Sequence, residues 1–98
     1  MEKAHQACRF FVSYTGVKLP LKLVNPIEAD ALSNRNTFMR AYFNDAGLLM
    51  GFDKMVYGEV ELAHRYVYHA NGILKQAEIV MRDEDTVTLC FDDGGSLL

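Results

Sequence analysis

A seven-residue pattern, aromatic-x-x-x-Gly-x-Leu, constrains the fold of this chain more than any other feature of its sequence. It occurs three times, at Phe43–Leu49, Tyr68–Leu74 and Phe91–Leu97. The glycines of successive copies are 25 and 23 residues apart, so the pattern is a loose internal repeat. A repeat of this kind indicates one structural unit that is used three times.

Each copy predicts a β-hairpin closed by a three-residue loop. In such a loop a type I turn is followed by one residue with a left-handed backbone, which glycine adopts without a side-chain clash. The loops Asp45-Ala46-Gly47, Ala70-Asn71-Gly72 and Asp93-Gly94-Gly95 all have glycine at that place. Counting outward from them pairs an aromatic residue with a leucine: Phe43 with Leu49, Tyr68 with Leu74 and Phe91 with Leu97. Each pair, called an aromatic–leucine clasp below, contributes about 0.2–1 kcal/mol.

The middle copy, Tyr66-Val67-Tyr68-His69-Ala70-Asn71-Gly72-Ile73-Leu74, resembles the tyrosine-aspartate repeat of bacterial Rhs and teneurin-type proteins and the related variant of the MORN repeat. Those families use Tyr-x-Tyr-Asp-x-x-Gly-x-Leu. His69 stands where they have Asp, the first copy has Asn44 there, and the third keeps Asp92. The resemblance covers roughly residues 37–98. It implies tandem β-hairpins that act as scaffolding in a small bacterial-type protein, and no function is transferred by it.

The remaining chain also predicts strands separated by turn signals. The expected strands are Arg9–Tyr14, Val17–Leu23, Thr37–Asn44, Leu48–Tyr57, Glu59–His69, Ile73–Met81 and Thr86–Phe91. Helix formers at residues 27–32 predict a short helical turn after Asn25-Pro26. About seven strands joined mostly by tight turns predict an all-β fold, an antiparallel meander.

Two strands carry more specific signals. In Val17–Leu23, apolar residues alternate with Lys18, Pro20 and Lys22, which predicts an edge strand, because proline cannot donate to a ladder and lysines discourage pairing. Gly51 inside Leu48–Tyr57 predicts a bulge or a close approach of another backbone.

Several strands, notably Leu48–Tyr57 and Ile73–Met81, are apolar on both faces, which a sheet with one solvated face would not be. Either the sheet is strongly twisted or closes partly into a barrel, or a second molecule covers its outer face. We therefore expect a homodimer or a protein partner.

Composition excludes several classes of function. The 98 residues form one domain, half of them are apolar, and the formal net charge is −3. Without a basic stripe we expect no nucleic-acid partner, and without a long apolar run or a secretory signal we expect no membrane association and a cytoplasmic location. Residues 1–7 predict a short tail or helical start. Cys8 and Cys90 are expected to be reduced thiols in or near the core.

Three side chains on one face of the strand Glu59–His69 are candidate ligand-binding residues: His64, Tyr66 and Tyr68. Together they would offer aromatic walls and a group that titrates near neutral pH. The alternative is that they are core aromatics whose hydroxyls reach outward. We interpret the His5 and Cys8 pair, and the acidic turns at residues 83–85 and 92–93, as incidental, and predict no metal, cofactor or catalytic residue.

The function that these observations favour is a protein-interaction module or accessory subunit built from tandem β-hairpins. The alternative is a small-molecule binding protein or an enzyme with a pocket near His64, Tyr66 and Tyr68. No nucleophile elbow or phosphate-binding glycine loop is present, so a binding role is favoured over an enzymatic one.

Overall fold

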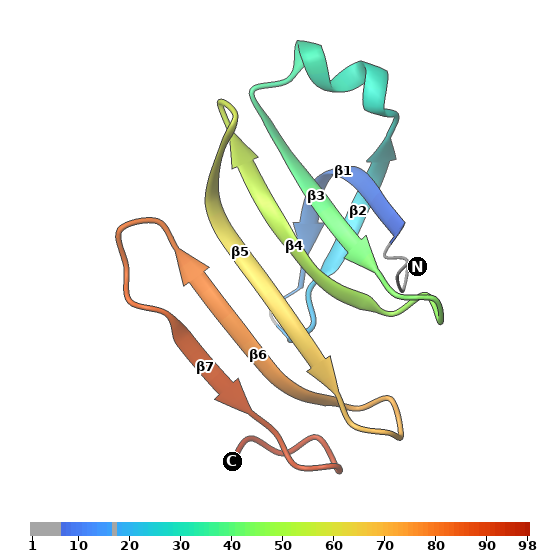
Figure 1. Ribbon diagram of the computed structural model, residues 1–98, viewed down its shortest axis with the longest axis vertical. Helices are drawn as coiled ribbons and strands as arrows, with labels where there is room; N and C mark the ends of the chain where they lie inside the picture. The colour runs from blue at the N-terminus through green and yellow to red at the C-terminus, as the bar shows by residue number, and fades with distance from the viewer. Residues whose placement is uncertain (1–6, 17) are drawn as a thin grey trace, which may run out of the picture.

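The fold is one antiparallel sheet of seven strands, and the computed structural model describes residues 7–16 and 18–98 of it (Figure 1). The strands are β1 (Ala7–Thr15), β2 (Lys22–Ile27), β3 (Thr37–Phe43), β4 (Leu49–Val56), β5 (Glu59–Tyr68), β6 (Leu74–Met81) and β7 (Val87–Cys90). A short 3-10 helix, η1 (Ala29–Asn34), joins β2 to β3. The prediction of an all-β fold with about seven strands and one short helical segment is confirmed.

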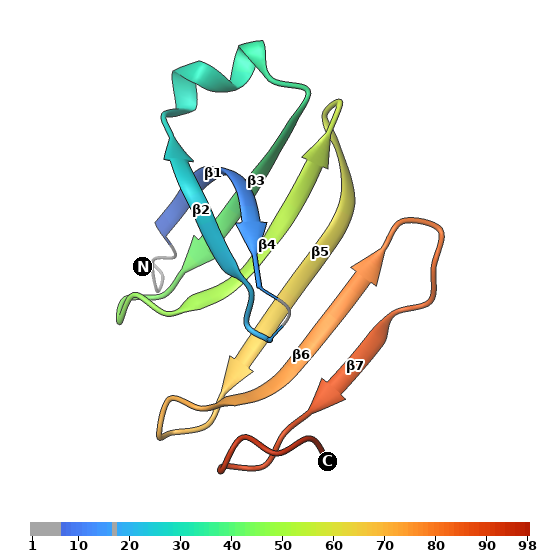
Figure 2. The same ribbon diagram turned by 180° about the vertical axis from the view of Figure 1, so that it is seen from behind.

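The strand order is β2-β1-β3-β4-β5-β6-β7. From β3 onward the chain is a meander, whereas β1 lies between β2 and β3 and pairs with both. The sheet is open, with β2 and β7 at its edges. Figures 1 and 2 show that it is strongly twisted and that β2 lies across one face of the neighbouring strands. We call the face that β2 covers the inner face and the opposite one the outer face.

All three repeated turns have the predicted geometry. In each turn the glycine N–H donates to the carbonyl three residues earlier: Gly47 to Asn44, Gly72 to His69 and Gly95 to Asp92. The three glycines have φ of 85°, 87° and 92°. The clasps pair as expected: Phe43 with Leu49, Tyr68 with Leu74 and Phe91 with Leu97. Because successive copies are two strands apart, the three turns lie at the same end of the sheet (Figure 1).

The residue that the repeat families fill with aspartate caps these turns. In the first turn Oδ1 of Asn44 accepts hydrogen bonds from the N–H groups of Ala46 and Leu48. Asp92 does the same in the third turn. His69 instead donates from Nε2 to the carbonyl of Phe91, 2.9 Å away, and so connects the second turn to the third. The departure from the pattern at His69 thus replaces a bond within one turn by a bond between two.

The edge strand near the N-terminus differs from the prediction. It covers Lys22–Ile27 rather than residues 17–23, and it contains Asn25 and Pro26 instead of ending at them. Pro26 is tolerated because β2 is an edge, and Asn25 has a positive φ of 60°. Residues 18–21 form a loop because Leu19 and Leu21 pack against the core. The helical segment begins at Ala29 because Ile27 still pairs with Phe10.

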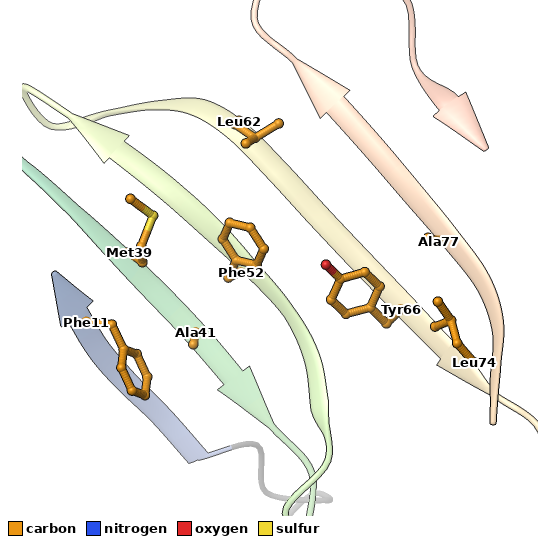
Figure 3. Close-up of a cluster of buried hydrophobic side chains, with 8 residues drawn as sticks. All are labelled: Phe11, Met39, Ala41, Phe52, Leu62, Tyr66, Leu74 and Ala77. Atoms are coloured by element: carbon orange, nitrogen blue, oxygen red, sulfur yellow. The ribbon is translucent and has the colours of Figure 1, made fainter. Parts of the chain in front are cut away.

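The buried core lies on the inner face. It is formed by side chains from β1, β3, β4, β5 and β6, which Figure 3 shows together: Phe11, Met39, Ala41, Phe52, Leu62, Tyr66, Leu74 and Ala77. The close approach predicted at Gly51 is confirmed, since a β-carbon there would collide with the backbone carbonyl of His64. The backbone carbonyl of His64 on β5 can therefore lie this close to β4 only because position 51 has no side chain.

Some predictions concern the ends of the chain. The expected tail and His5 lie outside the described residues. Cys8 and Cys90 are free thiols, but both are exposed, so their expected place in the core was wrong. The reason is that Cys8 pairs with Tyr42 on the outer face and Cys90 lies on the edge strand β7. No helix in residues 7–16 and 18–98 is long and apolar enough to cross a membrane.

Candidate functional site: an apolar pocket at the clasped turns

A pocket of about 1000 Å³ lies between the segment 18–23 and the end of the sheet that carries the three repeated turns. Figure 2 shows that the β1–β2 connection and the start of β2 lie in front of the inner face. The leucines of this segment form one wall: Leu19, Leu21 and Leu23. Strand β1 contributes Phe11 and β7 contributes Leu89. A pocket of this size is at the upper end of the range for small-molecule sites.

The three clasps supply the opposite wall. All six of their side chains line the pocket: Phe43, Leu49, Tyr68, Leu74, Phe91 and Leu97. They converge because the three turns share one end of the sheet and because a clasp directs both of its side chains to the same face. The repeat therefore produces one continuous apolar surface rather than three separate hairpin contacts.

The polar side chains at the pocket have a single sign of charge. Arg9, Lys18 and Lys22 contribute to the lining, and no Asp or Glu is among the described residues that do so. The guanidinium carbon of Arg9 lies 5.8 Å from the ring centres of both Phe11 and Phe43. The whole chain has a formal net charge of −3, so the positive charge at this pocket is a local feature.

Of the three predicted ligand-binding residues, only Tyr68 lines the pocket. Its hydroxyl donates a hydrogen bond of 2.5 Å to the carbonyl of Leu49, and burial raises its pKa. The hydroxyl of Tyr68 therefore stays neutral, and its hydrogen bond links the second clasp to the first. A ligand-binding role for Tyr68 remains a prediction, but its position in the wall fits that role.

His64 and Tyr66 lie in the core behind the pocket, with exposed fractions of 4% and 2%. The imidazole stacks on Phe52 with ring centres 4.7 Å apart. Burial lowers the pKa of His64 and raises the pKa of Tyr66 to about 12. The imidazole is therefore neutral at pH 7, and Nδ1 accepts a hydrogen bond of 2.6 Å from the Tyr66 hydroxyl.

Tyr66 also holds the leucine wall in place. Its hydroxyl accepts a hydrogen bond from the backbone N–H of Leu21, which lines the pocket. The chain of contacts from Phe52 through His64 and Tyr66 thus reaches the loop that covers the inner face. In this arrangement His64 and Tyr66 position the pocket wall, and a ligand-binding role for them stays a prediction.

A charged cluster on the outer face was missed from the sequence. Asp53, which is 3% exposed, accepts hydrogen bonds from Arg40, Tyr42 and Arg65 at 3.0, 2.7 and 2.9 Å. Burial alone would raise the pKa of Asp53, but these three hydrogen bonds together lower it. Arg65 also lies over the ring of Tyr42, 5.3 Å from its centre. This cluster explains how β4 carries an acidic residue among buried ones.

Comparison with known proteins places the chain in a family. The model of a family of unknown function, DUF6156, matches residues 3–98. No curated protein and no solved structure matches the chain. The chain therefore belongs to this family of unknown function.

Proposed function

We propose that this chain is a small binding module that takes an apolar ligand into the pocket at the clasped turns. One observation carries the proposal: all six clasp side chains line the same pocket. Burying apolar ligand surface against such a wall stabilises a complex by about 25 cal/mol per Å². The resemblance to hairpin repeats fits this role, because the repeat supplies a rigid scaffold and the pocket uses its surface.

A neutral apolar dye tests this function without involving charge. We expect Nile red to bind the native protein with a blue-shifted, saturable rise in fluorescence. The substitution Leu89→Trp places a larger side chain in the pocket wall and should abolish this binding. Val67→Trp is the matched control, because Val67 lies on β5, is half exposed and does not line the pocket. Equal dye binding by both variants, or none by the native protein, would refute the proposal.

Protein binding at the edge of the sheet is a second candidate function. At the β2 edge, Pro26 and the positive φ of Asn25 disfavour further pairing. Strand β7 has neither proline nor charge among Val87–Cys90, and Val87 is 50% exposed. An extended partner strand can add to an edge of this kind.

Charge decides which partner strand fits this edge. Acidic residues lie on both sides of β7, at 83–85 and 92–93. An antiparallel second copy of β7 would bring these acidic flanks together, which is unfavourable, so a strand with basic flanks fits better. Light scattering on a sizing column should then give the monomer mass of 11.1 kDa. A peptide of alternating Val and Thr with Lys flanks should bind, and the same peptide with Glu flanks should not. A stable dimer would instead favour the second copy as occupant.

A further inference from the structure

The proposed function takes account of the apolar lining of the pocket at the clasped turns, but not of the positive charges in that lining. We infer that its ligand is a single-chain amphiphile with an anionic head group, such as a medium-chain carboxylate. This inference rests on the proposed function and specifies the chemical class of ligand. The apolar tail would lie against the clasps and the head group would face the cationic residues of the lining.

The wall of the pocket favours an apolar ligand tail. Apart from its three cations, the lining consists of glycine, proline, aliphatic and aromatic residues. The hydroxyl of Tyr68, the one side-chain polar group besides the cations among the described lining residues, is bonded to the carbonyl of Leu49. A ligand with polar groups along its length would lose hydrogen bonds to water without replacing them. An unbranched hydrocarbon chain has no such cost.

The charges of the lining favour an anionic head group. Arg9, Lys18 and Lys22 all line the pocket, and among the described residues none of them forms an ion pair. Lys18 and Lys22 are exposed, and in the chain they lie on either side of Leu19 and Leu21, two leucines of the wall. Three cations without a carboxylate at an apolar pocket repel a cationic head group and attract an anionic one. Lysine and arginine both bind carboxylates through charge-assisted hydrogen bonds.

A set of three ligands with the same tail separates this inference from the proposed function. Decanoate, decanol and decyltrimethylammonium are titrated, below their aggregation concentrations, into the Leu48→Trp variant. The chain has no tryptophan, and Leu48 lies at the pocket rim, so the introduced indole reports binding. We expect decanoate to bind about tenfold more tightly than decanol and the ammonium compound most weakly. The preference should weaken at high salt.

Substitutions at the lysines test the source of the preference. In the reporter variant, Lys18→Gln combined with Lys22→Gln should remove most of the advantage of decanoate over decanol. Lys75→Gln is the control, because Lys75 is exposed and does not line the pocket.

The length of the ligand tests the apolar tail. Extending the carboxylate by one methylene should tighten binding about fourfold, which corresponds to about 0.8 kcal/mol.

The outcomes are distinct. Equal affinity for decanoate and decanol would overturn the inference and leave the apolar-ligand function standing. No binding of any of the three ligands would overturn both. A further outcome is that the protein sediments with phosphatidylglycerol vesicles and does not bind monomeric decanoate. That result would show binding to an anionic membrane surface rather than to a single amphiphile, and would also overturn the inference. Preference for decanoate, lost on replacement of the two lysines, is the result expected.

Discussion

The hydroxyl of Tyr66 accepts a hydrogen bond from the backbone N–H of Leu21, 3.3 Å away, although 45 residues separate the two in the chain. The same hydroxyl donates to Nδ1 of His64. Tyr66 is thus the point at which the buried side of β5 holds the loop that forms one wall of the pocket.

Replacing Tyr66 by phenylalanine removes this oxygen and keeps the ring. The buried Nδ1 of His64 and the N–H of Leu21 then lose a partner, which should cost about 1–3 kcal/mol in the free energy of unfolding. Urea denaturation measures this cost. Tyr57→Phe is the control: Tyr57 is 76% exposed, so that variant should change stability by less than about 0.5 kcal/mol. Equal effects of the two substitutions would contradict the role given to Tyr66.

Stability should depend on pH through His64. Its pKa in the folded protein lies below the ordinary value of 6.5, and the cause is burial. The unfolded chain therefore binds more protons between the two pKa values, and the contribution of neutral His64 is fully present above about pH 6.5 and is lost as the pH falls below it. Urea denaturation at a series of pH values from about 8 to about 5 should show this loss. The variant His64→Gln should lack that part of the pH dependence; an unchanged profile would show that another group causes it.

The cluster around Asp53 predicts a second, separate effect. Asp53→Asn removes the charge that holds Arg40 and Arg65, and we expect a loss of about 1–3 kcal/mol because both arginines are partly exposed and regain water. Because the pKa of Asp53 is lowered, this contribution is present above the unfolded pKa, near 3.8, and disappears as the pH falls through the folded value. Chemical denaturation at pH 7 measures the loss. Glu61→Gln, which breaks the exposed pair with Lys54, should cost less than about 1 kcal/mol, and a larger loss there than at Asp53 would contradict this account.

Position 51 should tolerate no side chain. In Gly51→Ala the new methyl group would meet the carbonyl of His64, at a backbone φ of 158°. We expect the melting temperature to fall by about 8–16 °C, which corresponds to a loss of about 2 kcal/mol for a chain of this size. Gly94→Ala is a fair comparison, because its nearest neighbour is a side-chain oxygen of Asp92 at ordinary contact distance. Similar melting temperatures of the two variants would show that β4 and β5 can separate to admit the methyl group.

Much of the fold could be predicted because its signals are local. The glycines at 47, 72 and 95 set the loop type, and the loop type sets the register of each clasp. The edge strand could not be placed as well. Lys18, Pro20 and Lys22 alternate with apolar residues as in a strand, but Leu19 and Leu21 pack across the sheet as a loop, a tertiary contact that periodicity does not record.

The site could be predicted only in part. His64, Tyr66 and Tyr68 share a face, but sequence alone does not tell which of them reach a pocket and which are covered by Leu21 and Phe52. A usable signal was present in the repeat. Copies that are two strands apart in a meander place their turns at one end of the sheet, so the convergence of Phe43, Tyr68 and Phe91 followed from their spacing. Arg9 and Lys18 also line this pocket, because β2 and the loop before it lie across the inner face. No local sequence pattern predicts that arrangement.

The most direct test of the account is to map ligand contacts by NMR. Amide chemical shifts of the native protein would be followed while decanoate is added. We predict saturable shifts at residues 18–23 and at the three clasped turns, and none at Arg40, Asp53 or Val67 on the outer face. Shifts confined to the outer face or to β7, or no shifts at all, would contradict the claim that the repeated turns form a ligand pocket.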